Sequence, residues 1–87
     1  MNYVTLPIYF HTNDTTSLRE LGIAYKLSDC EIRQMEFFTI GAISDYVDDS
    51  IDEKLTSIFT NGYEFICAYD RQTTLDKILE SKLLHSL

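Results

Sequence analysis

The 87-residue sequence has few of the residues that build catalytic, metal or disulfide centres. It contains two cysteines, two histidines, three glycines, one proline and no tryptophan. Cys30 and Cys67 form no Cys-x-x-Cys pair and are too few for a disulfide framework or a tetrahedral zinc site. Both are predicted to be small buried side chains. The isolated glycines Gly22, Gly41 and Gly62 exclude a glycine-rich phosphate-binding loop.

Basic residues are also scarce. Seven Lys and Arg residues against fourteen Asp and Glu residues give a net charge of -7. This charge repels nucleic acid at long range and removes the counterion-release contribution to non-specific binding. The N-terminus has no basic stretch followed by an apolar core, and no apolar run approaches the ~18 residues of a membrane helix. These features predict a cytoplasmic protein without membrane association.

No residue stands in a recognisable catalytic context. His11 lies in a polar segment, His85 lies near the C-terminal end, and no Ser or Cys has a nucleophile pattern around it. The acidic segment 45–53 lacks the glycine and the spacing of a calcium-binding loop. It is interpreted mainly as a solvated loop, with contact to a cation or to a protein left open. The sequence therefore predicts no enzymatic activity, no cofactor and no metal site.

The composition predicts one folded domain over residues 1–87, because 45 % of the residues are hydrophobic and 13 % are aromatic. A chain of this size buries roughly 60 to 65 % of its unfolded surface, so an oligomer interface would add to a thin stability margin. The segment Tyr3 to Phe10 predicts a strand. Pro7 within it cannot donate to a ladder, which predicts a position at a sheet edge.

Three weaker signals follow along the chain. A polar loop from His11 is followed by Ser17-x-x-Glu20, closed by Gly22, which predicts one short helical turn. The alternation over residues 23–27 predicts a short strand. Gly41 separates two strand-like halves and predicts a bend or bulge within one long strand.

The strongest local signal is Asn61-Gly62 between two apolar runs, which predicts a tight hairpin. A two-residue turn fixes the register and leaves large apolar groups on both sides of the hairpin. The predicted cross-strand pairs are Thr60 with Tyr63, Ile58 with Phe65 and Thr56 with Cys67 on one side, and Phe59 with Glu64, Ser57 with Ile66 and Leu55 with Ala68 on the other.

The C-terminal part predicts an amphipathic helix capped by Asp70 or Thr73. Its apolar stripe must pack on the sheet or on a partner. The stripe consists of Leu75, Ile78, Leu79 and Leu83.

The segment Met35 to Ile43 (MEFFTIGAI), the segment Leu55 to Cys67 (LTSIFTNGYEFIC) and the helix after them resemble small uncharacterised proteins of tailed phages, especially those of marine cyanobacteria. The resemblance covers about the last 55 residues. The order of bent strand, Asn-Gly hairpin and closing strand is also similar to Sm-like proteins, which form rings and bind RNA. The implied fold is mostly β, a small strongly bent five-stranded Sm-like barrel with one C-terminal amphipathic helix.

In Sm-like proteins the base-binding loops combine a stacking side chain, an Asn and a basic residue before a Gly in the last hairpin. The matching positions here read Thr60-Asn61-Gly62, so the basic residue is missing. The resemblance implies Asn61 and Tyr63 as the nucleic-acid-binding residues. Aromatic side chains near strand ends can stack on bases, although packing in the core or at its rim is the alternative interpretation. These side chains are Tyr9, Tyr46, Tyr63 and Tyr69.

The leading hypothesis is a non-enzymatic, homo-oligomeric binding module of Sm-like type with RNA or DNA as its ligand. Either the strand that contains Pro7 or the strand over residues 63–69 pairs with a neighbour's edge, with Tyr3, Pro7 and Phe65 at the interface. The alternative hypothesis is an acidic phage-type interaction factor that binds a basic host protein through residues 45–53.

Overall fold

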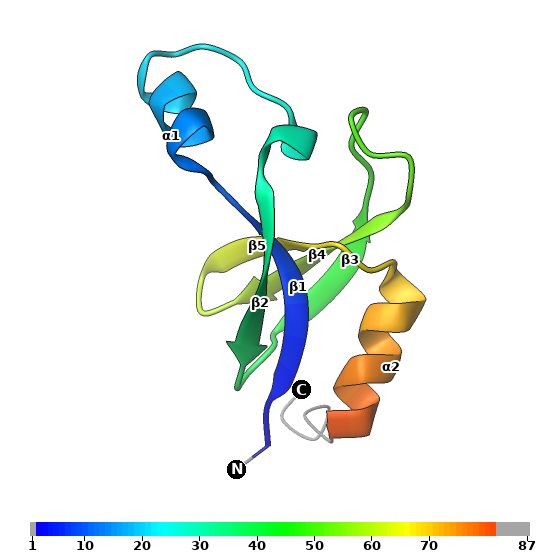
Figure 1. Ribbon diagram of the computed structural model, residues 1–87. Helices are drawn as coiled ribbons and strands as arrows, with labels where there is room; N and C mark the ends of the chain where they lie inside the picture. Colours follow the sequence, from blue (N-terminus) through cyan, green and yellow to red (C-terminus); the bar gives the residue numbers. More distant parts are fainter. Residues whose placement is uncertain (1, 82–87) are drawn as a thin grey trace.

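The computed structural model describes residues 2–81, so the predicted stripe residue Leu83 and His85 lie outside the described part. No helix within residues 2–81 is long and apolar enough to cross a membrane. The elements in chain order are β1 (Val4–Phe10), α1 (Asn13–Glu20), the 3-10 helix η1 (Leu27–Asp29), β2 (Glu31–Phe37), β3 (Ala42–Tyr46), β4 (Leu55–Thr60), β5 (Tyr63–Cys67) and α2 (Arg71–Ser81) (Figure 1).

The five strands form one antiparallel sheet in the order β2-β1-β5-β4-β3. The predicted mostly β fold with a C-terminal helix is confirmed. The sheet is open, with β2 and β3 as its two edges, so the predicted closed barrel is not formed. Figure 1 shows the sheet curled, with β1 and β2 crossing over β4 and β3, and with α2 along one side.

The prediction that β1 is an edge strand is wrong, because β1 lies between β2 and β5. Pro7 lies opposite Gln34 of β2, and its carbonyl accepts a 2.8 Å hydrogen bond from the N–H of Ala68. The N–H and C=O of a residue in an antiparallel strand point the same way, so the missing donor of proline faces β5. There the ladder consists of the single pair Ile8 with Cys67. Proline is accommodated because this ladder is so short.

The second predicted edge, β5, is also inside the sheet, between β1 and β4. The hairpin that joins β4 to β5 is confirmed. Asn61 and Gly62 have φ angles of 52° and 83°, as a type I′ turn requires. The pairs from Thr60 with Tyr63 to Thr56 with Cys67 have the predicted register.

The prediction of one long strand bent at Gly41 is wrong. Its two halves are separate strands, since β2 pairs with β1 and β3 pairs with β4 at the opposite edge. The N–H of Gly41 donates a 2.8 Å hydrogen bond to the carbonyl of Phe59. A Cβ at Gly41 would approach that oxygen to 3.2 Å, so glycine permits this close approach. The connection thereby joins both edges of the curled sheet.

Helix α1 replaces the predicted polar loop and single turn. Thr12 and Thr15 form its capping box, with Thr15 N–H donating to Thr12 Oγ1 at 3.1 Å and Thr12 N–H donating to Thr15 Oγ1 at 2.7 Å. The helix therefore begins earlier than the predicted box of Ser17 and Glu20. Gly22, with φ of 73°, follows the helix end as predicted.

The predicted strand over residues 23–27 is not formed. Residues 23–26 make an irregular connection, and Leu27 begins η1. The alternation on which the prediction rested is kept in part, because Tyr25 and Leu27 are half-buried while Ala24 and Lys26 are exposed, but Ile23 is exposed too. The alternation reflects packing against one side of the molecule without a strand partner.

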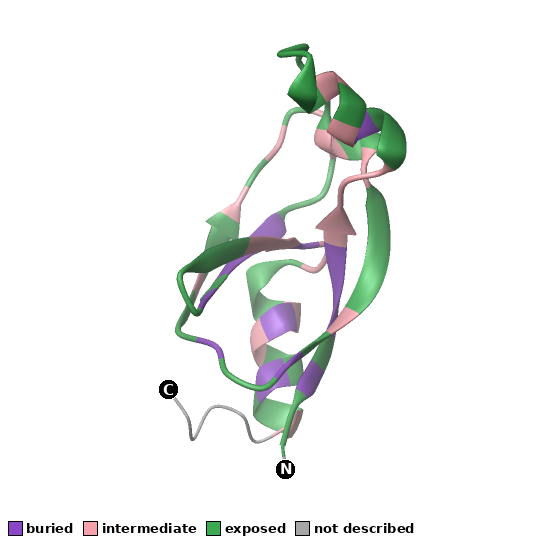
Figure 2. Cartoon of the chain, turned by 90° about the vertical axis from the view of Figure 1, so that its left-hand side faces the viewer, coloured by how far each residue is buried: buried purple, intermediate pink, exposed green. Residues whose placement is uncertain are grey.

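Helix α2 covers the sheet with a face that matches the predicted stripe in part, since Ile78 is buried and Leu75 is half-buried. Asp70 caps it by accepting a 2.8 Å hydrogen bond from Thr73 N–H, as predicted. Its buried residues are Thr74 and Ile78, whereas Leu79 is 46 % exposed. Figure 2 shows buried and exposed stretches alternating along the helix. Through Ile78 the helix joins the buried hydrophobic cluster, which consists of Val4, Leu6, Ile8, Phe37, Ile40, Ile58, Cys67 and Ile78.

Candidate functional site

A cavity of about 510 Å³ lies between the sheet and the connection from α1 to η1. Its volume is within the range of small-molecule binding sites. We refer to it as the tyrosine cavity, because three of its lining residues are tyrosines; among the described residues, no Lys or Arg lines it. The lining consists of the aromatic residues Tyr9, Phe10, Tyr25, Tyr46 and Phe65, the polar residues His11, Cys30, Asp48 and Glu64, and the aliphatic residues Leu27 and Ile66.

The sheet register brings the floor of the cavity together. Glu64 of β5 lies opposite Phe59 of β4, and Tyr46 of β3 lies opposite Leu55 of β4. Residues that face each other, and residues two apart in a strand, share one side of a sheet, so Tyr46 and Glu64 project from the same side. Ser57, on this side too, donates a 2.7 Å hydrogen bond to Glu64 Oε2 and fixes that carboxylate.

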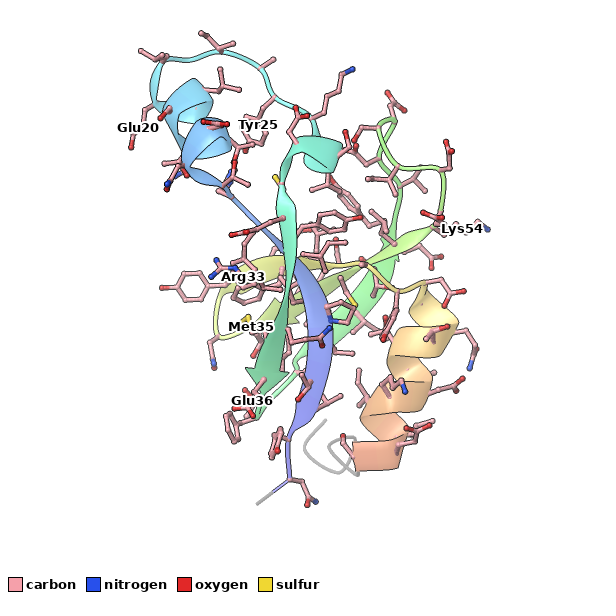
Figure 3. All side chains as sticks on the ribbon, viewed as in Figure 1. Glu20, Tyr25, Arg33, Met35, Glu36 and Lys54 are labelled. Carbon is pink, nitrogen blue, oxygen red and sulfur yellow. The ribbon has the colours of Figure 1, made fainter. Side chains whose placement is uncertain are left out.

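His11 holds Tyr25 over the cavity. Its Nε2 lies 3.3 Å from the hydroxyl of Tyr25, and the two rings meet edge to face with centroids 5.0 Å apart. Its Nδ1 lies 3.2 Å from Oγ1 of Thr15, which is buried at the start of α1. Figure 3 shows Tyr25 next to α1, at the end of the molecule that also carries η1. His11 therefore acts as a positioning residue for Tyr25.

Asp48 forms the acidic part of the rim. Ser50 donates both its N–H, at 3.0 Å, and its hydroxyl to Asp48 Oδ2. The hydroxyl bond and then the N–H bond lower the pKa of Asp48, which keeps this carboxylate ionised. The N–H of Ser28 donates to Ser50 Oγ at 3.0 Å, so η1 is tied to the same loop.

The carboxylates set a negative potential at the cavity. Burial, followed by the charges of Glu53 and Asp48, raises the pKa of the Tyr9 hydroxyl. Burial, followed by the charges of Asp48 and Glu64, raises the pKa of the Tyr46 hydroxyl. A potential that opposes formation of a phenolate attracts a cation.

The cysteine in the cavity is not an activated nucleophile. Cys30 is half-buried rather than fully buried as predicted, whereas the prediction for Cys67 is confirmed. Burial is the largest influence on Cys30 and raises its pKa, which favours the thiol over the thiolate. Within residues 2–81, no three His, Cys, Asp or Glu side chains are placed to hold a metal ion.

The predicted nucleic-acid residues lie elsewhere. Asn61 is at the exposed tip of the hairpin, and Tyr63 beside it is 68 % exposed. Both line a smaller hollow of about 210 Å³ together with Phe38. The ring of Phe38 also lies 5.6 Å from that of Tyr3, which is 47 % exposed. The structure thus brings Asn61 and Tyr63 together, outside the tyrosine cavity.

The residues predicted for an oligomer interface do not form one surface. Tyr3 is exposed, Pro7 is buried inside the sheet, and Phe65 is half-buried with its ring edge-on to Phe37 at 5.6 Å. Tyr69 packs on the buried hydrophobic cluster. Self-association through these residues stays a prediction, and the free strand edges belong to β2 and β3 instead.

Sequence reasoning missed the cavity residues His11, Tyr25 and Glu64. Two signals pointed to Tyr25 and Glu64, and none pointed to His11. The alternation over residues 23–27 marks Tyr25 as facing inward, and the hairpin register places Glu64 opposite Phe59, on the side that also carries Ser57 and Ile66. Comparison of the chain with protein families, curated proteins and solved structures finds no match. The resemblances to tailed-phage and Sm-like proteins therefore stay predictions.

Proposed function

We propose that this protein is a non-enzymatic binding protein whose partner is a basic protein. The observation that carries the proposal is the lining of the tyrosine cavity, which combines aromatic rings and carboxylates and, within residues 2–81, includes neither Lys nor Arg. The guanidinium of Arg33 lies over the ring of one lining residue, Phe10. Aromatic faces and carboxylates both attract cations. The cavity is therefore complementary to a positively charged side chain.

The wider charge distribution favours the same partner. The net charge is -7, and Glu53 on the loop before β4 acts on the cavity together with Asp48. Complementary potentials speed association and suppress partners of like charge. Such a surface favours a basic protein over the phosphates of RNA or DNA.

The state of the polar cavity residues supports a binding role over a catalytic one. Both ring nitrogens of His11 lie within hydrogen-bond distance of neutral hydroxyls, those of Tyr25 and Thr15. Both nitrogens therefore contact side chains of the protein itself, which suits a positioning role. Cys30 has a raised pKa in place of the lowered one of a reactive thiol.

The test measures binding of a fluorescent peptide of repeated Arg-Gly-Ser units by anisotropy at increasing salt concentration. The variant Asp48→Asn/Glu64→Gln removes two charges from the cavity and keeps acceptors for Ser50 and Ser57. We expect it to bind roughly tenfold more weakly, a loss of about 1.4 kcal/mol.

The matched control is Glu36→Gln/Asp76→Asn, which changes the net charge equally at exposed positions outside the cavity lining. We expect less than a twofold effect from it. Equal weakening by both double variants would show attraction to the net charge alone, and the proposed site would be wrong. Absence of peptide binding by the unchanged protein would refute the function.

A second candidate is the Sm-like oligomer that binds nucleic acid. The exposed hollow with Asn61, Tyr63 and Phe38 favours it, because exposed rings are platforms for base stacking. The edges β2 and β3 offer strands for pairing between copies. Anisotropy with labelled oligouridylate tests it, since Tyr63→Ala should abolish binding. A strictly monomeric mass by light scattering would contradict the oligomer.

A further inference from the structure

We infer that the tyrosine cavity binds the guanidinium group of an arginine side chain. The inference rests on the proposed function, because the basic partner supplies the arginine. The chemistry of the cavity is nevertheless testable with an isolated side chain. Three features of the cavity carry the inference, which are the tyrosine rings, the two carboxylates and the available volume.

The aromatic walls suit a planar, weakly hydrated cation. Tyr9 and Tyr46 come from the sheet, while Tyr25 comes from the connection between α1 and η1 and lies against His11. Guanidinium stacks on aromatic rings through cation–π and planar contact, and it loses less hydration than an ammonium group does. The protein already contains such a contact, since the guanidinium carbon of Arg33 lies 4.3 Å from the ring centroid of Phe10.

The acceptors distinguish arginine from other cations. Asp48 and Glu64 present carboxylates, and guanidinium has five N–H donors in a fixed fork that matches them. A quaternary ammonium group has no N–H donor, so it adds no hydrogen bond to these carboxylates. A lysine ammonium group has donors but no planar face, and its stronger hydration opposes entry between aromatic rings.

The volume suits a whole side chain. At about 510 Å³ the cavity exceeds what a guanidinium head alone fills, so it has room for the aliphatic stem as well. Leu27 and Ile66 supply apolar surface in the lining, against which the methylene groups can pack. The cavity therefore matches both the charged head and the apolar stem of arginine.

The experiment titrates the full chain with Nα-acetyl-arginine methylamide and follows the ring resonances of Tyr9, Tyr25 and Tyr46 by NMR. We expect saturable shifts at these rings and dissociation constants at least fivefold lower than for the lysine analogue or for choline. Equal or tighter binding of either comparison ligand would overturn the inference. Shifts confined to residues outside the cavity would overturn it too.

Variants separate the contributions of ring and hydroxyl. Tyr46→Leu should weaken binding roughly tenfold, whereas Tyr46→Phe should retain most of the affinity. Tyr3→Leu, an exposed tyrosine outside the cavity lining, should change nothing. If Tyr46→Leu does not give a folded amide spectrum, Glu64→Gln tests the same site through its carboxylate. Unchanged affinity in the folded variant would contradict the inference.

The two proposals fail in different ways. If the arginine derivative does not bind while the Arg-Gly-Ser peptide still depends on Asp48 and Glu64, the guanidinium site is wrong and the proposed function stands. If the derivative binds while the peptide does not, the site is correct and the basic protein partner is wrong.

Discussion

The orientation of α2 gives a sharp test of the packing, because two neighbouring apolar residues are placed differently. Ile78 is 0 % exposed and belongs to the buried cluster, whereas Leu79 is 46 % exposed. The amphipathic pattern alone assigns both residues to the same buried stripe. Truncating each residue to alanine therefore tests whether the described packing or the amphipathic pattern alone predicts the loss of stability.

Ile78→Ala should cost about 2 to 5 kcal/mol, the usual loss of transfer free energy plus the cavity left in a packed core. Leu79→Ala should cost at most about 1 kcal/mol, because half of the side chain is already in water and alanine favours the helix. A domain of this size loses about 4 to 8 °C in Tm per kcal/mol. Ile78→Ala should therefore lower the Tm by roughly 10 °C or more.

The assay is thermal and urea unfolding followed by circular dichroism, with both variants measured beside the unchanged protein. A total stability of about 4 to 13 kcal/mol is expected for 87 residues, so both losses are measurable. Equal losses, or a larger loss for Leu79→Ala, would refute the described packing of α2 on the sheet.

Three further predictions concern the turn, the pH dependence and the cavity. Gly62→Ala should lower the free energy of unfolding by about 1 kcal/mol in urea melts, because the φ of 83° at this position strains any residue with a Cβ. The loss comes from the backbone alone, since no neighbouring atom would lie within 4 Å of that Cβ. Hydrogen bonds from Thr73 lower the pKa of Asp70 in the folded state, so its contribution is present above roughly pH 4 and is lost on acidification through the folded pKa. Asp70→Asn should therefore flatten the acid limb of stability measured against pH. Asp48→Asn should lower the raised pKa of Tyr46 in a ¹³C NMR titration, because it removes the largest charge contribution to that shift; an unchanged Tyr46 pKa would contradict the described potential.

Local chemistry made parts of the fold predictable. Asn61-Gly62 specifies a type I′ turn, because both residues tolerate positive φ, and one turn then fixes every pair of the hairpin. Asp70 likewise caps α2 through a bond to a residue three positions away. Such features depend on neighbours in the sequence, so no tertiary information is needed to find them.

The errors arose where partners distant in sequence decide the outcome. Pro7 indicated an edge, but the short β1–β5 ladder leaves its missing donor without consequence. Gly41 indicated a bend in one strand, but its role is a close approach to the carbonyl of Phe59 at the other edge. Thr74 escaped the apolar pattern, although its hydroxyl bonds to the carbonyl of Asp70 and lets it be buried.

The cavity was less predictable than the fold for the same reason. Tyr9, Tyr25, Tyr46 and Glu64 come from four separate segments. The order of the strands brings Tyr9, Tyr46 and Glu64 together, and the contact with His11 places Tyr25. The sequence shows acidic residues and tyrosines in abundance, without showing which of them meet. The region 45–53 contributes Tyr46 and Asp48 to the cavity, whereas the rest of the acidic segment lies outside its lining.

The charged side chains are placed in a way that suits binding of a partner better than stabilisation of the fold. In the described residues 2–81, the ion pairs Glu31–Arg33 and Lys77–Glu80 are exposed, and such pairs contribute little to stability. Carboxylates instead lie near the tyrosine hydroxyls, where after burial their charges raise the pKa of Tyr9 and Tyr46. A cationic side chain in the cavity would be attracted by the same carboxylates. Because it binds only the folded chain, it also raises the free energy of unfolding, so partner binding and stability are linked through the same few carboxylates.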